Sequence, residues 1–77
     1  MQTQSVIAQI PPLRAVRIAR GKSLRSTASG AGIDPAHLSR IERGMSQPSL
    51  EVLLALAREL ELRELTALLT PYVGEAS

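Results

Sequence analysis

The chain of 77 residues has no cysteine, no phenylalanine and no tryptophan, and it contains one tyrosine and one histidine. The lack of cysteine excludes disulfide bonds and thiolate metal sites, and it is typical of a protein kept in a reducing compartment. Because aromatic rings are nearly absent, a core of Leu, Ala, Ile and Val must provide the stability. One histidine and scattered serines supply neither a set of metal ligands nor a nucleophile with its base. We therefore expect no metal, no cofactor and no catalytic activity.

Long hydrophobic runs are absent as well. The longest uninterrupted apolar run, from Val52 to Ala57, is far shorter than the roughly 18 residues that a membrane span needs. Residues 1–10 lack a basic start followed by an apolar block, which is the pattern of a secretory signal. The sequence thus predicts a cytoplasmic protein that has no contact with a membrane.

The net charge of +2 conceals an uneven division of charged side chains along the chain. Residues 1–48 carry seven basic and two acidic side chains, which leaves +5, whereas residues 49–77 carry two basic and five acidic ones, which leaves −3. A positive half of this kind favours a polyanion as the binding partner. A chance distribution of solvated charges is the alternative.

The length of the chain allows one domain with one core. Residues 1–10 are expected to form an arm, because the β-prone stretch Val6–Ile10 is stopped by two prolines. Three states are open to this arm: disorder, packing against the domain, or pairing with a second copy of the chain. Residues 11–70 form the predicted domain, and residues 71–77 form a C-terminal tail.

Apolar residues recur with helical spacing through the domain, which predicts an all-α fold of five helices. Capping residues or prolines stand at four of the expected starts, and glycine follows the first three helices. The expected helices run from Pro12 to Gly21, from Ser23 to Gly32, from Asp34 to Gly44, from Ser49 to Leu60 and from Leu62 to the residue before Pro71. Their buried faces are predicted to hold Leu13 and Val16 with the stem of Arg20, then Leu24, Ala28 and Ala31, then Leu38 and Ile41, then Leu50, Leu53, Leu54, Ala57 and Leu60, and finally Leu62, Leu65, Leu68 and Leu69.

The second and third helices are joined by a short turn that contains Gly32 and is anchored by Ile33. This arrangement is typical of a helix-turn-helix motif, in which the second helix of the pair enters the DNA major groove. The motif alone is not specific, because many small helical domains place a glycine between two short helices. If Leu38 and Ile41 are buried, the opposite face of the third helix is directed toward solvent. That solvent-directed face holds Ala36, Ser39, Arg40 and Arg43.

The surrounding sequence resembles the lambda-repressor-like Cro/C1-type, or XRE, family of helix-turn-helix domains from about Leu13 to Leu69. The most characteristic segment is LSRIERG at residues 38–44, followed by PSL at residues 48–50 and a leucine-rich helix. The resemblance implies a compact five-helix domain. It also implies a sequence-specific DNA-binding transcriptional regulator of the repressor type, which reads double-stranded DNA with its third helix. We expect a homodimer on a palindromic operator, associated with the nucleoid.

Other functions of the same fold stay open at this stage. One is an antitoxin that binds a toxin and autoregulates through DNA binding. Another is a module for protein–protein interaction that docks through the Val6–Ile10 arm or the leucine face. A toxin or a regulator is the protein partner that these alternatives allow. Some members of the family continue into a second domain, so the chain is also compatible with a fragment of a longer regulator.

Residue by residue, the resemblance assigns contacts with DNA bases to Pro35, Ala36, Ser39 and Arg40. Contacts with DNA phosphates are expected from Ser23, Arg25, His37, Arg43, Ser46 and Gln47, and for His37 a contact with the sugar edge or a solvated side chain stays open as an alternative. Arg17 and Glu42 are expected to form an ion pair that ties the first helix to the third. The apolar excess of the last helix predicts a dimer interface that contains Leu62, Leu65, Leu69 and Tyr72, with or without the arm.

The chain departs from the family at the start of the second helix. Many members have Leu-Ser-Gln where this chain has Lys22-Ser23-Leu24, so a glutamine that often contacts phosphate is missing. Thr27 replaces a usual leucine, which reduces the size of the core.

Overall fold

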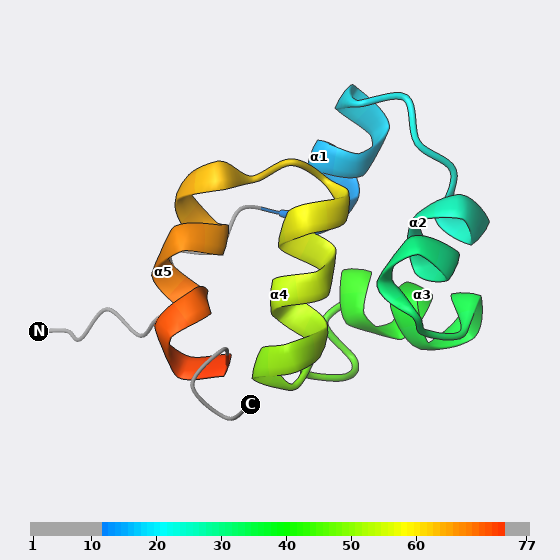
Figure 1. The fold of residues 1–77 in the computed structure, drawn as a ribbon. Helices are drawn as coiled ribbons and strands as arrows, with labels where there is room; N and C mark the ends of the chain where they lie inside the picture. Colours follow the sequence, from blue (N-terminus) through cyan, green and yellow to red (C-terminus); the bar gives the residue numbers. More distant parts are fainter. Residues whose placement is uncertain (1–11, 74–77) are drawn as a thin grey trace, which may run out of the picture.

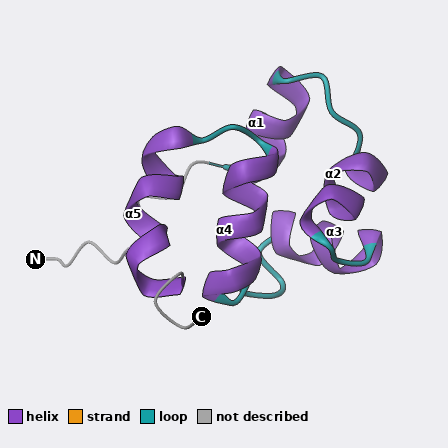
Figure 2. Ribbon diagram, in the orientation of Figure 1, coloured by secondary structure: helices purple, strands orange, loops and turns teal. Residues whose placement is uncertain are grey.

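The computed structural model describes residues 12–73, and every regular element in this part of the chain is an α-helix. The predicted all-α fold with five helices is therefore confirmed (Figures 1 and 2). No helix among these residues is long and apolar enough to cross a membrane. The predicted arm of residues 1–10 and the last four residues of the predicted tail lie outside the described residues. The helices are α1 (Leu13–Ala19), α2 (Leu24–Ala31), α3 (Pro35–Glu42), α4 (Leu50–Glu59) and α5 (Arg63–Val73).

Three of the helices begin at side-chain caps that the sequence predicted. The Ser23 hydroxyl accepts a hydrogen bond from the Ser26 amide at 3.0 Å. The Asp34 carboxylate accepts one from the Ala36 amide at 2.8 Å, and the Ser49 hydroxyl accepts one from the amide of the third residue of α4 at 3.1 Å. Each cap satisfies an amide that has no partner within its helix, which stabilises the helix start by about 1 kcal/mol.

The turn between α2 and α3 is closed by backbone hydrogen bonds. The Ile33 amide donates to the Ala28 carbonyl oxygen at 2.9 Å, and Gly32 between them has φ 76°, in the left-handed region that glycine adopts without strain. The same pattern ends α4, where the Leu62 amide donates to the Ala57 carbonyl oxygen at 2.8 Å. The left-handed residue at this position is Glu61, with φ 59°. Only three residues, 32–34, separate the end of α2 from the start of α3, so the first turn keeps the two helices close together.

Helix α4 lies at the centre of the molecule, between α5 on one side and α2 with α3 on the other (Figure 1). Leu56 packs with Ala28 and Leu38 in one buried cluster, whereas Leu53 and Leu54 form a second cluster with residues of α5. The apolar spacing of this helix predicted one buried stripe that included Leu50 and omitted Leu56. This prediction was wrong: Leu56 is fully buried and Leu50 is 50% exposed. A helix packed between two layers buries more than one face, so a single stripe does not describe it.

The end of α5 also differs from the prediction. The helix was expected to stop before Pro71, but Pro71 lies within it and the helix continues to Val73. Val73 packs against the cluster of Leu53, Leu54 and Leu69, and this contact favours another helical turn. Proline removes one amide donor, and in the last turn of a helix that loss affects few hydrogen bonds.

Candidate nucleic-acid interface

The exposed face of α3 is defined by what the opposite face buries. Leu38 and Ile41 are buried, and Leu38 packs against Ala28 of α2 and Leu56 of α4. Helical spacing then turns the other side of α3 outward. On this side Ala36, Arg40 and Arg43 are exposed, while Pro35, His37 and Ser39 are half-buried.

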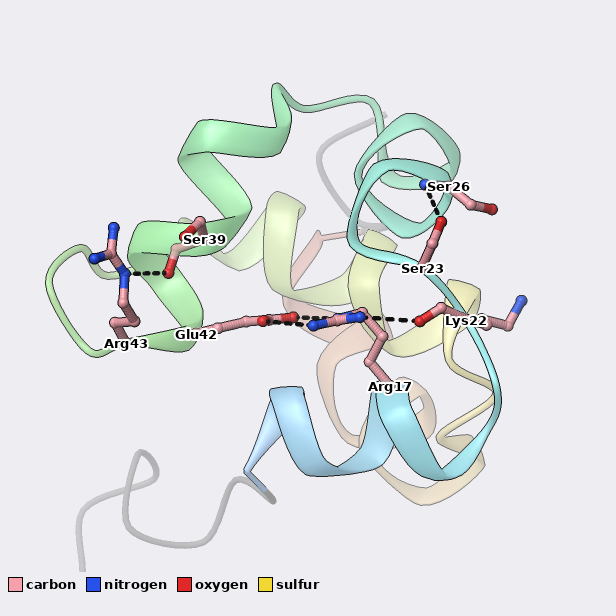
Figure 3. Close-up of polar contacts among 7 residues, drawn as sticks. All are labelled: Arg17, Lys22, Ser23, Ser26, Ser39, Glu42 and Arg43. Carbon is pink, nitrogen blue, oxygen red and sulfur yellow. Dashed lines mark hydrogen bonds and ion pairs between the residues drawn. The ribbon is translucent and has the colours of Figure 1, made fainter.

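The exposed guanidinium groups of Arg40 on α3 and of Arg43, the C-cap of α3, have no acidic partner among residues 12–73. Arg40 forms no ion pair there, and the side chain of Arg43 makes one hydrogen bond among these residues, from its Nε to the Ser39 carbonyl oxygen one turn earlier at 3.4 Å (Figure 3). The two nearest acidic residues in the sequence are already engaged, because Asp34 caps α3 and Glu42 pairs with Arg17. The face therefore presents positive charge that no side chain of the described part neutralises.

Arg17 of α1 forms the expected ion pair with Glu42 of α3, and the contact is bidentate. Arg17 Nε donates to Glu42 Oε2 at 2.7 Å, and Arg17 Nη2 donates to Glu42 Oε1 at 3.1 Å (Figure 3). The exposed fractions of the two side chains are 11% and 4%. The hydrogen bonds with Glu42 raise the pKa of Arg17, against the opposing effect of burial and with the help of the Glu42 charge. The bidentate contact thus attaches α1 to α3.

Two further ion pairs attach the C-cap of α1 and the turn before α2 to the end of α4. Arg20 Nη1 lies 3.7 Å from Glu61 Oε1, and Lys22 Nζ lies 3.6 Å from Glu59 Oε2. These cations lie at the C-terminal end of α4, where the helix dipole also favours positive charge. The stem of Arg20 was predicted to lie on the buried face of α1, but the side chain is exposed. Both pairs join residues far apart in the sequence, so no local pattern indicated them.

The residues expected to contact phosphates are divided between α2, α3 and the loop that follows α3. The Ser23 hydroxyl is engaged as the cap of α2, and Arg25 is exposed on the first turn of the same helix. In the loop before α4, Ser46 is half-buried and Gln47 is exposed. The structure thus places these side chains on the elements that flank the outward face of α3.

The described residues offer hydrogen bonds and positive charge rather than metal chemistry. His37 is half-buried on α3. Across residues 12–73, no three side chains of the His, Asp and Glu types gather in a group that could hold a metal ion. Guanidinium groups, hydroxyls and backbone amides are the groups available at this face, and all of them suit an anionic or base-bearing ligand.

The residues of α5 that are exposed, and so available to a second copy of the chain, differ from those predicted for the dimer interface. Leu69 is buried within the chain against Leu53 and Leu54, and Leu65 packs against the same cluster. Leu69 was expected to lie in a dimer interface, but it is 3% exposed and offers almost no surface to another molecule. The exposed apolar side chains of α5 are instead Leu68, at 52%, and Tyr72, at 70%. Tyr72 follows Leu68 by four positions, one helical turn, so the two side chains lie on the same face of the helix.

Comparison with known proteins agrees with this geometry. A helix-turn-helix family model matches residues 13–67. Over 50 residues, or 65% of this chain, the sequence is 40% identical to the transcriptional regulator ClgR of Mycobacterium tuberculosis, and the match covers 45% of that protein. Over the same length it is 42% identical to the uncharacterized HTH-type transcriptional regulator y4dL of Sinorhizobium fredii, and covers 26% of it. The match thus spans less than half of either relative. No solved structure matches the chain significantly.

Proposed function

The chain belongs to the Cro/C1-type helix-turn-helix family of DNA-binding regulators, and we propose from this that it represses transcription by inserting α3 into the major groove of an operator. The single observation that carries the proposal is the outward face of α3, where Arg40 and Arg43 have no acidic partner in the described part of the chain. Both relatives are named as transcriptional regulators, which favours regulation over an antitoxin or a module that binds only proteins.

Base reading depends chiefly on Arg40. A guanidinium group can donate to O6 and N7 of guanine together, and this is the commonest specific contact of the major groove. Ala36, one helical turn before Arg40, offers a methyl group that fits against the methyl of thymine. Ser39 is half-buried and Pro35 has no donor, so these two contribute less to specificity than Arg40.

Phosphate binding depends on groups that flank this face. Arg25 and the free amides of the first turn of α2 are placed to hold one stretch of DNA backbone. The Nε of Arg43 is engaged with its own helix, and its two terminal nitrogens remain available for a second phosphate. Ser23, His37, Ser46 and Gln47 complete the proposed phosphate contacts.

We propose further that the regulator is a homodimer that pairs the exposed faces of α5. The only aromatic side chain of the whole sequence, Tyr72, is 70% exposed there beside Leu68. Tyrosine is among the residues that contribute most to protein interfaces. Two-fold symmetry then predicts a palindromic operator whose half-sites are separated by about one turn of DNA, roughly 34–36 Å.

The experiment that tests the base-reading role selects bound sequences from a random DNA pool and then compares three variants on the selected operator. We expect Arg40→Ala to lose about 1–3 kcal/mol of binding free energy and to relax the preference at one base pair. Arg43→Ala should weaken binding to all sequences alike and reduce the salt dependence by about one phosphate contact. Arg58→Ala is the matched control, since Arg58 is an exposed arginine on α4 with no proposed contact. Wild-type affinity and preference in Arg40→Ala would refute the proposed docking.

A further inference from the structure

Arg17 contacts more than its ion-pair partner. Its Nε and Nη2 donate to the carboxylate of Glu42 on α3, and its Nη1 donates to the Lys22 carbonyl oxygen at 2.9 Å (Figure 3). Lys22 directly precedes Ser23, the residue that caps α2. One guanidinium group thus connects the residue before the start of α2 to the last residue of α3.

We infer that Arg17 is a positioning residue that holds the phosphate-binding start of α2 in register with the reading helix α3. The inference rests on the proposed function, because it concerns how that DNA-binding face is held. It assigns Arg17 an effect on sequence discrimination as well as on stability. Arg17 itself touches no DNA in this proposal.

The burial of the contact supports this role. The Arg17 and Glu42 side chains are 11% and 4% exposed, so solvent competes little for their hydrogen bonds. Helix α1 contains no fully buried residue, which means that its polar contacts contribute much of its attachment. The backbone of Lys22 accepts the hydrogen bond from Arg17, and its side chain pairs with Glu59 of α4. The segment before α2 is therefore held both by Arg17 and by α4.

The chemistry of the contact requires arginine. Guanidinium presents donors in a planar fork, and here its nitrogens point in two directions at once. A lysine ammonium is a single point of charge on a flexible stem, and it can keep the attraction to Glu42 without holding the Lys22 carbonyl oxygen in the same geometry. Arg17→Lys therefore preserves the charge of the site and removes the connection between the two elements.

Loss of this connection affects specific binding more than nonspecific binding. Phosphate contacts are the same on every DNA sequence, so α2 can still bind the backbone when α3 is displaced. Base contacts have a narrow geometry, and they tolerate displacements of only about 0.5 Å. The prediction is a loss of discrimination between operators, not a uniform loss of affinity.

The test measures binding to the selected operator and to the same operator changed at the base pair that Arg40 reads. For the wild type we expect the two affinities to differ by about tenfold or more. In Arg17→Lys the ratio of the affinity for the selected operator to the affinity for the changed operator should fall below about threefold. The affinity for the changed operator should stay within about threefold of wild type. Arg20→Lys is the matched control, because Arg20 is also an arginine from the end of α1 but pairs with Glu61, away from α3. Its ratio should equal that of the wild type.

A second variant separates positioning from folding. Arg17→Met combined with Glu42→Leu replaces the ion pair by apolar side chains of similar size, an exchange that often leaves stability unchanged or higher. Circular dichroism at low temperature establishes that each variant is folded under the binding conditions. In a folded double variant the affinities for the selected and the changed operator should differ by less than about threefold, as we expect for Arg17→Lys.

The outcomes are distinguishable. Wild-type discrimination in the folded double variant, or an equal loss of affinity for both operators in Arg17→Lys, would overturn the inference and leave the proposed function intact. An equal loss of discrimination in Arg20→Lys would also overturn it, because the effect would then belong to α1 as a whole. Absence of any sequence preference in the wild type would overturn the proposed function itself.

Discussion

Thr27 has an unsatisfied polar group in the interior of the domain. The residue is fully buried in α2, and its hydroxyl has no hydrogen-bond partner among the described residues. A buried hydroxyl that has lost its water and found no replacement costs free energy, in protein mutational data about 1–3 kcal/mol. The resemblance implied only that threonine makes the core smaller at this position. The structure adds that the hydroxyl itself is a source of instability.

We predict that Thr27→Val raises the free energy of unfolding by about 1 kcal/mol, because valine has the same shape without the hydroxyl. Thermal unfolding should show the midpoint rising by roughly 4–8 °C for a domain of this size. Thr27→Ser is the control, since it keeps the hydroxyl and deletes the methyl group, and it should lower stability by about 1 kcal/mol. A destabilised Thr27→Val variant would mean that the hydroxyl has a favourable partner.

At the scale of the helices, the turns carry a second source of instability. Helices α1, α2 and α3 are followed by a left-handed glycine, whereas α4 is followed by a left-handed glutamate, Glu61. A residue with a Cβ atom pays about 1–2 kcal/mol for this conformation. The ion pair that Glu61 forms with Arg20 is exposed at both ends, so it offsets little of this cost.

Glu61→Gly should therefore stabilise the domain by about 1 kcal/mol, net of the larger chain entropy that glycine gives to the unfolded state. Gly21→Ala is the matched opposite: Gly21 has φ 71° and nothing lies near the added Cβ, so only the backbone conformation is penalised. We expect it to lower the free energy of unfolding by about 1 kcal/mol, measured by urea denaturation of both variants. The free energy of unfolding should rise in Glu61→Gly and fall in Gly21→Ala. A change in the same direction in both variants would contradict this explanation of the turns.

The helix elements show which parts of the fold can be predicted from sequence. The starts at Ser23, Asp34 and Ser49 were correct because a cap and the amide it satisfies are within three residues of each other. The end of α5 was wrong because Val73 packs against residues of α4, and no local pattern near Pro71 contains that contact. Local chemistry was therefore sufficient for helix starts but not where packing between helices decides the boundary.

The candidate site also has features that the sequence predicts and one that it does not. The buried and exposed faces of α3 follow from the spacing of Leu38 and Ile41, which is a property of one helix. The resemblance supplied the pair of Arg17 and Glu42. The third contact of Arg17 goes to a backbone carbonyl oxygen, and no residue type in the sequence signals such an acceptor. It became visible only when the chain was folded.

Considered as a whole, the molecule uses part of its positive charge internally. Three of the seven basic residues in the first 48 form ion pairs with glutamates. Arg17 pairs with a glutamate of α3, Arg20 with one in the turn after α4, and Lys22 with one of α4. The remaining four make no ion pair with the described residues, and two of them lie on the outward face of α3. The charge division along the sequence therefore overstates the charge that is free for a polyanion. The basic residues of this half without an ion pair are Arg14, Arg25, Arg40 and Arg43.

The proposed homodimer is the property of the whole molecule that a single substitution tests most directly. Leu68→Glu places a charge on the exposed face of α5, where an interface with a second copy would have to bury it without a partner. We expect the dissociation constant of the dimer to rise by about 100-fold or more, measured by analytical ultracentrifugation. Ile18→Glu is the matched control, because Ile18 on α1 is 53% exposed and Leu68 is 52% exposed, and only Leu68 lies on α5. The control should retain the wild-type dissociation constant.

DNA binding by the same two variants connects the dimer to the operator. Leu68→Glu should bind a single half-site with wild-type affinity, since the substitution is on α5 and far in sequence from α3, but it should lose cooperative binding to the palindrome. The fluorescence of Tyr72, the only tyrosine in a chain without tryptophan, reports directly on the proposed interface and should stop changing with protein concentration in this variant. If Leu68→Glu dimerises as wild type does, the two copies do not meet through this face of α5, and the operator spacing inferred from it has no structural support.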